Sequence, residues 1–222
     1  MRVALCLQGL SDNFNNKGDL VDSLSCVDSI HEHIITHNNA DVFIHTWSTS
    51  AESIEALRSK YDPKLSIFEK QIMFDSEVTK YHCTKSRWYS QMKSIELKKQ
   101  YEQENNFVYD IVMISRFDCF YRTHIDFSSL EADQFYASNW LKPHSDTGFL
   151  DYWFISNSMN MNKFGDLYHK IDEYLSSGAV LSNHTLSKHH IKSLGLEDNT
   201  SYVMFSPKDF DLIRMLLIRG EI

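Results

Sequence analysis

The 222-residue sequence lacks several patterns that mark particular classes of protein. Its four cysteines form no Cys-x-x-Cys pair and no zinc-ligand spacing, and we expect most of them to be small core residues in a reducing compartment. The formal net charge is −8 and there is no lysine or arginine run, so a nucleic-acid partner is not expected. No apolar stretch approaches the ~20 residues of a membrane helix, and residues 1–10 are too short for a signal peptide. These absences together favour a cytoplasmic protein without a transmembrane segment.

Internal repeats and low-complexity linkers are also missing, which favours one domain over residues 1–222. A chain of this length can bury a sizeable core. In the first half, residues 1–121, apolar stretches alternate with helical patterns joined by short links, which predicts parallel strands in a Rossmann-like, nucleotide-binding half. The second half is residues 122–222. The expected strands of the first half are 2–7, 41–47, 64–68 and 111–115.

The stretch around which the rest is arranged is YDIVMISRFDCFY, residues 109–121. Its apolar run from Ile111 to Ser115 is bounded by charge, and its length and β-branched content favour a strand buried on both faces over a buried helix. The run ends at Arg116 and Asp118, and open α/β sheets bind ligands at this end of a strand. Asp118 is a hard oxygen ligand suited to Mg²⁺ or Mn²⁺, and Arg116 is a forked donor suited to phosphate. A salt bridge that merely closes the strand end explains the two residues equally well.

Four pieces of the chain, in order, resemble small glycosyltransferase-like proteins found in bacterial capsule and lipopolysaccharide gene clusters and in large DNA viruses. In nucleotide-sugar transferases of the GT-A type, an aspartate-x-aspartate metal motif stands where this chain has Arg116-x-Asp118. The resemblance covers most of residues 2–121 and implies a GT-A-like α/β fold of three layers, with a mostly parallel mixed central sheet and helices on both faces. The matching pieces are VALCLQG, NADVFIHTW, WYSQMKSIELKKQYEQENNFVYD and the central strand.

The resemblance implies transfer of a sugar from a nucleotide sugar, UDP- or GDP-linked, to a glycan acceptor in polysaccharide or glycoprotein glycan synthesis. Because the departing diphosphate gains negative charge, such a site needs a cation and fixed donors aimed at it. Asp118 is the expected ligand of Mn²⁺ or Mg²⁺, with Arg116 and Lys93 adding positive charge. The first acid of the metal motif is replaced by Arg116, so metal-free catalysis by Arg116 and Lys93 also stays open.

The donor is expected to contact two further parts of the first half. Gln8 and Gly9 follow the first strand and would hold the base and ribose, although no GxGxxG pattern is present there. The resemblance places the long helix before the central strand beside the donor, so Gln91 and Lys93 become candidates for contacts to phosphate or sugar. A solvated lysine is the ordinary alternative for Lys93.

In the second half, Asp151 opens the aromatic stretch LDYWFIS, where similar transferases place a carboxylate that faces the acceptor. An inverting enzyme needs a carboxylate base near the acceptor hydroxyl, for which we choose Asp151, with Asp146 behind it. No nucleophile for a retaining reaction is identifiable. Peripheral association with a membrane-borne acceptor stays open.

Two other functions remain. One is a catalytically inactive module of the same fold that binds a nucleotide or a glycan. The other is a nucleotidyltransferase that makes the activated sugar, but such enzymes usually carry a glycine-rich loop with lysine and arginine after the first strand. The corresponding stretch here, SDNFNNKGD, contains one glycine.

Helix signals complete the pattern. Thr49-x-x-Glu52 resembles a capping box that begins a helix, and residues 69–84 have no period and are expected to be a loop before a helix over 85–105. Apolar residues at helical spacing predict one helix from Met161 to Leu175. Ser206 followed by Pro207 predicts the start of the last helix.

Three histidines lie on the helix expected over residues 183–194, namely His184, His189 and His190. Their spacing does not bring them to one face, so they are not expected to form a zinc site. One of them could still be the additional metal ligand that GT-A enzymes often take from the C-terminal region.

Overall fold

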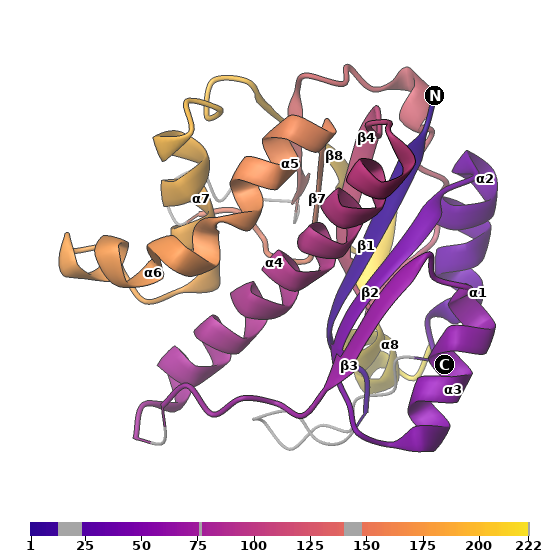
Figure 1. Ribbon diagram of the computed structural model, residues 1–222, viewed down its shortest axis with the longest axis horizontal. Helices are drawn as coiled ribbons and strands as arrows, with labels where there is room; N and C mark the ends of the chain where they lie inside the picture. The colour runs from indigo at the N-terminus through magenta and orange to yellow at the C-terminus, as the bar shows by residue number, and fades with distance from the viewer. Residues whose placement is uncertain (13–23, 76, 140–147, 222) are drawn as a thin grey trace.

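Figure 1 shows the computed structural model, which describes residues 1–12, 24–75, 77–139 and 148–221. Seven strands form one sheet in the order β3-β2-β1-β4-β7-β6-β8. The first four strands in sequence are parallel, β7 is antiparallel to both of its neighbours, and β6 and β8 are parallel to each other. The predicted mostly parallel mixed α/β sheet is therefore confirmed, and its first half is Rossmann-like. The strands are β1 (Val3–Leu10), β2 (Asp41–Trp47), β3 (Leu65–Glu69), β4 (Ile111–Arg116), β6 (Phe135–Asn139), β7 (Trp153–Ser156) and β8 (Thr200–Phe205).

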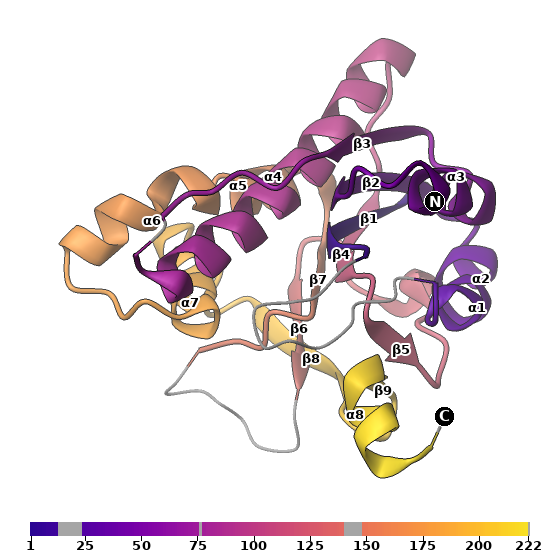
Figure 2. The same cartoon turned by 90° about the horizontal axis from the view of Figure 1, so that it is seen from below.

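Helices cover both faces of the sheet, as Figure 2 shows. Side chains alternate along β1, so Leu5 and Leu7 pack into one core with the helices of one face, while Ala4 and Cys6 pack into a second core with α4. The first face carries α1 (Val27–Ile30), the π-helical turn η1 (His31–Ile35), α2 (Thr36–Asn38) and α3 (Ala51–Tyr61). The second carries α4 (Thr79–Asn105) and α5 (Ser158–Gly165), flanked by α6 (Leu167–Ser176) and α7 (Asn183–Ser193).

Two helix starts differ from the predicted ones. The cap of α3 is Ser50, whose hydroxyl accepts a hydrogen bond from the Ser53 amide at 3.3 Å, one residue beyond the predicted Thr49. The helix α4 begins at Thr79, within the stretch expected to be a loop. Just ahead of it, the Asp75 carboxylate accepts hydrogen bonds from the Glu77 and Val78 amides, which supplies a start signal that apolar periodicity does not reveal.

The single helix predicted from Met161 to Leu175 is wrong, because the chain breaks at Asp166 into α5 and α6. At this break α5 lies close against α4. A Cβ atom added to Gly165 would come within 3.0 Å of the Ile95 side chain. The apolar residues on both sides of the break are buried or half-buried, so their periodicity predicts the core but not the bend.

The helix predicted to begin at Ser206 is also wrong. Residues 206–209 form a turn in which the Asp209 amide donates to the Phe205 carbonyl at 2.8 Å. A short strand follows, β9 (Phe210–Leu212), and pairs antiparallel with β5 (Cys119–Tyr121). The last helix, α8 (Ile213–Arg219), begins only after that strand. Pairing with a distant strand thus overrides the local helix signal.

A buried lysine joins α4 to the start of α5. The Lys98 ammonium is fully buried and donates to Glu102, Ser158 and Asn162 at 2.9, 2.5 and 2.8 Å. The other carboxylate oxygen of Glu102 accepts from the Tyr109 amide at 2.9 Å and from the Ser158 hydroxyl at 2.7 Å. This network fixes the far end of α4 against the chain entering β4.

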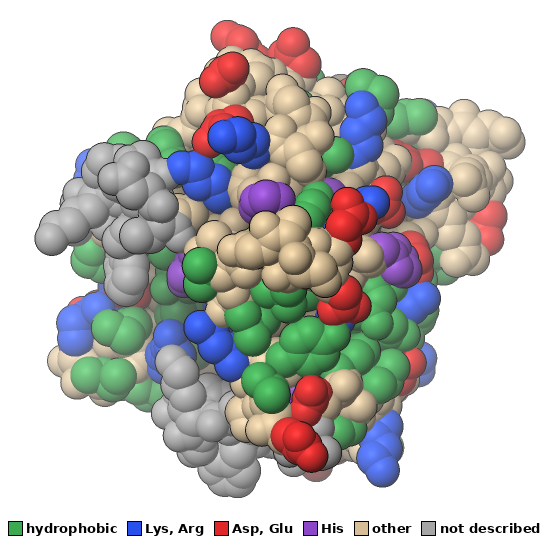
Figure 3. Space-filling view, turned by 90° about the vertical axis from the view of Figure 1, so that its left-hand side faces the viewer, with side chains coloured by type: hydrophobic (Ala, Val, Ile, Leu, Met, Phe, Trp, Pro, Cys, Tyr) green, Lys and Arg blue, Asp and Glu red, His purple; other side chains and the backbone are tan. Residues whose placement is uncertain are grey.

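Figure 3 views the face that carries α6 and α7, where basic, acidic and histidine side chains are intermixed. The coloured part of this face therefore shows no broad basic stripe of the kind that nucleic-acid binding uses. In the ranges that the structure describes, no helix combines the length and the apolar character needed to cross a bilayer.

Candidate functional site

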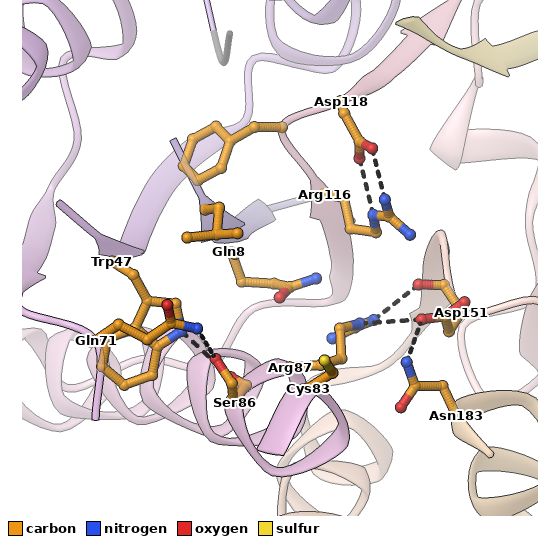
Figure 4. Close-up of a pocket in the computed structure, with 13 residues that line it drawn as sticks. Gln8, Trp47, Gln71, Cys83, Ser86, Arg87, Arg116, Asp118, Asp151 and Asn183 are labelled. Carbon is orange, nitrogen blue, oxygen red and sulfur yellow. Dashed lines mark hydrogen bonds and ion pairs between the residues drawn. The ribbon is translucent and has the colours of Figure 1, made fainter. Parts of the chain in front are cut away.

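A pocket of about 210 Å³ lies at the carboxyl ends of β1 and β4, on the side of the sheet covered by α4 (Figure 4). Parallel strands present their carboxyl ends at one edge of the sheet, which is where open α/β sheets bind ligands. The helix α4 supplies a wall of the pocket, and the turn before β7 and the first residue of α7 complete it. The lining residues are Gln8, Gly9, Leu10, Trp47, Gln71, Cys83, Ser86, Arg87, Arg116, Phe117, Asp118, Asp151 and Asn183.

Strand register brings two of the predicted residues together. Gln8 of β1 is paired with Arg116 of β4, and residues paired in neighbouring parallel strands project to the same face. In Figure 4 the Gln8 side chain lies between Trp47 on one side and the two arginines on the other. Gln8 is 1% exposed, and neither polar atom of its amide has a hydrogen-bond partner among the described residues. A buried amide without partners is available to a ligand.

Arg116 and Asp118 form a forked ion pair beside Gln8. Nε of Arg116 donates to Oδ1 of Asp118 at 2.8 Å, and Nη2 donates to Oδ2 at 2.5 Å. Burial would lower the pKa of Arg116, but the carboxylates of Asp118 and Asp151 outweigh it and raise that pKa. The side chains of Arg116 and Asp118 are 24% and 21% exposed, so both are within reach of a ligand in the pocket.

A second arginine, Arg87 of α4, faces Arg116 across the pocket. Its Nη2 donates to the main-chain carbonyl of Asp151 at 2.9 Å, its Nε lies 3.4 Å from Oδ2 of Asp151, and its Nη1 donates to Oε1 of Gln91 at 3.0 Å. Burial lowers the pKa of Arg87 to about 10, against the opposing effect of the Asp151 carboxylate. Arg87 is therefore charged at neutral pH and held in one orientation.

The Asp151 carboxylate lies at the centre of a polar group. Oδ2 accepts from Nδ2 of Asn183 at 3.2 Å in addition to its contact with Arg87, and Oδ1 lies 3.5 Å from Nδ1 of His184. Burial would raise the pKa of Asp151, but Arg87, Arg116 and His184 together lower it. Asp151 is thus ionised at neutral pH, and its basicity is reduced.

Of the other predicted residues, some line the pocket and some do not. Gly9 lines the pocket at a φ of 119°, and its amide donates to the Ser90 hydroxyl at 2.9 Å. Gln91 is buried behind the pocket, where it orients Arg87. Lys93 does not line the pocket, and its ammonium is paired with Glu96 at 2.7 Å. Asp146 lies outside the described residues.

The three histidines of α7 do not converge, as expected. His184 bonds the Phe149 carbonyl through Nδ1, His190 bonds the Tyr174 hydroxyl through Nδ1, and the His189 ring packs on Tyr174. Only His184 comes near the pocket, through its contact with Asp151.

Sequence reasoning missed Arg87, Trp47 and Asn183. Arg87 precedes Gln91 by four residues and therefore lies on the same face of α4, so the placement of Gln91 beside the donor was a usable signal for Arg87. Trp47 ends β2 at the sheet edge where the ligand was expected. Asn183 carried no signal, because only the packing of α7 brings it to Asp151.

The described residues near Asp118 do not fit Mn²⁺ or Mg²⁺ as they are arranged. Both oxygens of Asp118 accept from Arg116, and the other carboxylate of the pocket lining, Asp151, is engaged by Arg87 and Asn183. A divalent cation bound there would lie beside two guanidinium groups. A cation at Asp118 would therefore compete with Arg116 for the same carboxylate.

The structure is thus an α/β fold with a pocket at the strand ends, lined by two arginines, two carboxylates and a buried amide that has no hydrogen-bond partner among the described residues. A comparison with protein-family models found no match, and a comparison with curated protein sequences found none either.

Proposed function

We propose that the protein is a glycosyltransferase with a GT-A-like fold, which moves a sugar from a UDP- or GDP-sugar to a glycan acceptor. The observation that carries the proposal is the pocket at the ends of β1 and β4, where Arg87 and Arg116 lie on one side of the buried Gln8 amide, which has no hydrogen-bond partner among the described residues. Two guanidinium groups suit a diphosphate, and a buried amide suits the polar edge of a base or a sugar. The resemblance of residues 2–121 to small glycosyltransferase-like proteins supports the same substrate class.

The chemical step breaks the bond between the anomeric carbon and the diphosphate oxygen and forms a bond from that carbon to the acceptor oxygen. Arg87 and Arg116 stabilise the negative charge that develops on the diphosphate. Each is oriented in advance by a carboxylate, Asp151 or Asp118, so little reorganisation is needed when the charge develops. In this proposal Arg87, and not Lys93 as predicted from the sequence, adds positive charge beside the diphosphate.

The proton of the acceptor hydroxyl goes to Asp151 in this proposal. Oδ1 is the oxygen that neither Arg87 nor Asn183 engages, and its neighbour is His184 at 3.5 Å, so we assign the proton to Oδ1. The lowered pKa makes Asp151 a weak base, so it takes the proton only when bond formation is well advanced. We derive no step through Mn²⁺ or Mg²⁺, because both carboxylate oxygens of Asp118 accept hydrogen bonds from Arg116. The experiment below tests metal dependence.

The second candidate is a catalytically inactive module that binds a nucleotide or a glycan in the same pocket. The low basicity of Asp151 and the closed Arg116–Asp118 pair favour it, since binding requires neither a strong base nor a free metal ligand. The two candidates differ in turnover and share the binding site.

The test is a thermal-shift screen of UDP- and GDP-sugars with and without MnCl₂, followed by measurement of sugar released by hydrolysis. A ligand that binds only the folded state raises the Tm. We expect one nucleotide sugar to do so in the wild type and in Arg58→Ala, an exposed arginine of α3 that serves as the matched control, but not in Arg87→Ala. Slow hydrolysis identifies the transferase, whereas binding without hydrolysis identifies the inactive module. Equal shifts in Arg87→Ala and the wild type would contradict the proposed site.

A further inference from the structure

Three histidines gather on the face of the sheet opposite to α4. His33 and His37 are one turn apart in the helical segment α1–η1–α2, and His124 follows β5. Nδ1 of His33 lies 3.2 Å from Nδ1 of His124. The rings of His37 and His124 are stacked, with centroids 4.5 Å apart and an interplanar angle of 12°. None of these residues lines the pocket at the strand ends.

A carboxylate completes this cluster. Glu32 is adjacent to His33, and one ligand atom from each of Glu32, His33 and His124 lies within 4.8 Å of the other two. Ligands in a tetrahedral zinc site lie at about 2.0–2.1 Å from the metal, which puts them roughly 3.3 Å from each other. The separation of the two histidine nitrogens already matches this geometry. Glu32 is exposed, so its side chain can close the remaining distance by rotation.

The two segments that carry the cluster are joined by one main-chain hydrogen bond and by two hydrogen bonds of the Asn38 side chain. The Ile125 amide donates to the His33 carbonyl at 3.3 Å. Asn38 donates from Nδ2 to the Ile125 carbonyl at 2.8 Å, and its Oδ1 accepts from the Phe127 amide at 3.0 Å. His33 and His124 are therefore held opposite each other by the fold, independently of the contact between their rings.

The neighbouring His31 is engaged elsewhere. Its Nε2 lies 2.7 Å from the Lys60 carbonyl, and its ring stacks on Tyr61. The convergent set is thus two imidazoles and one carboxylate, with His37 beside them.

We propose that Glu32, His33 and His124 bind a divalent transition-metal ion, separately from the pocket at the strand ends. Imidazole and carboxylate together suit Zn²⁺, and three protein ligands leave a fourth position for water or for His37. The ion would connect η1 to the chain between β5 and η2 (Phe127–Ser129), so binding is coupled to the stability of the fold.

The test is isothermal titration of Zn²⁺ into metal-stripped protein, together with the Tm measured with and without Zn²⁺. We expect one site in the wild type, a higher Tm with Zn²⁺, and an affinity at least about tenfold lower in His33→Ala and in His124→Ala. The matched control is His169→Ala, an exposed histidine of α6, which should bind Zn²⁺ as the wild type does. Asp118→Asn should also retain binding, which separates this site from a metal at the pocket.

His124 is exposed, so His124→Ala tests the proposal even where His33→Ala perturbs the fold. The Tm without metal reports on folding for each variant. Absence of a stoichiometric site in the wild type overturns the proposal. Wild-type affinity in His124→Ala, or a loss in His169→Ala as large as in His124→Ala, overturns it as well.

Discussion

Replacing Gln8 by methionine tests two effects of its buried amide: a lower free energy of unfolding in the free protein, and a contact with the bound ligand. The Gln8 amide is buried without a partner among the described residues, and an unsatisfied buried polar group costs about 1–3 kcal/mol. Methionine is unbranched and adaptable, so it fills the same space without the amide. We therefore expect Gln8→Met to raise the free energy of unfolding by about 1–3 kcal/mol. For a chain of this size, each kcal/mol corresponds to roughly 2–4 °C in Tm.

The measurement is urea denaturation followed by far-UV circular dichroism, with the slope of the free energy against urea compared between variant and wild type. The matched control is Gln103→Met on the exposed face of α4, which should stay within about 0.5 kcal/mol of the wild type. In the same samples, Gln8→Met should lose the Tm increase caused by the nucleotide sugar. A loss of more than about 1 kcal/mol in Gln8→Met would refute the reasoning, because it would mean that the amide is already hydrogen-bonded in the free protein.

Four further predictions concern the charged residues. Arg116→Lys and Arg116→Ala should lower turnover by similar factors, because lysine lacks the fork that Asp118 grips; near-wild-type turnover in Arg116→Ala would make Arg116 a structural strand-end residue. Asp151→Asn should lower the rate by ~10²–10⁴-fold while calorimetry shows little change in donor affinity, because Arg87 remains bonded to the main chain of Asp151. Asp118→Asn should abolish any Mn²⁺-dependent part of nucleotide stabilisation with the fold intact, and equal stabilisation in mutant and wild type would remove the metal role. Lys98→Met should lower the free energy of unfolding by about 3–5 kcal/mol, since it leaves a buried carboxylate unpaired, and a loss below about 1 kcal/mol in urea denaturation would contradict this.

The strands of the first half could be predicted because their signals are local. The apolar run of β4 is bounded by charged residues, and β2 begins and ends where the sequence indicates, at Asp41 and Trp47. Helix ends were less predictable. The break at Asp166 lies where α5 packs against Ile95, and β9 exists because β5 offers it a partner. Both depend on residues far away in the chain, which a window of sequence does not contain.

The residues of the candidate site likewise divide into those with a local sequence signal and those placed by distant contacts. Five of the predicted residues line one pocket at the sheet edge where a ligand was expected, and their roles stay predictions: Gln8, Gly9, Arg116, Asp118 and Asp151.

Whether Arg87 or Lys93 of α4 faces the pocket depends on how that helix is rotated against the sheet. The weak amphipathic pattern of the helix does not determine this rotation. Sequence reasoning took Lys93, and the structure places Arg87 in the pocket. The burial of Lys98 could not be predicted from the sequence, because lysine is rarely buried. The pairing of His33 with His124 is likewise set by the fold and by no local spacing.

The pairing of β5 with β9 has a consequence for synthesis of the protein. The carbonyl of Asp118 accepts from the Ile213 amide at 2.9 Å, directly after the β9 strand that holds β5 in place. A ribosome delivers the parallel strands and Asp118 long before it delivers Phe210 and Ile213. Until then the segment bearing Asp118 lacks the strand that pairs with β5. A chain cut short before residue 210 would lack both the strand that pairs with β5 and four side chains of the core on that face, Phe210, Leu212, Ile213 and Leu216.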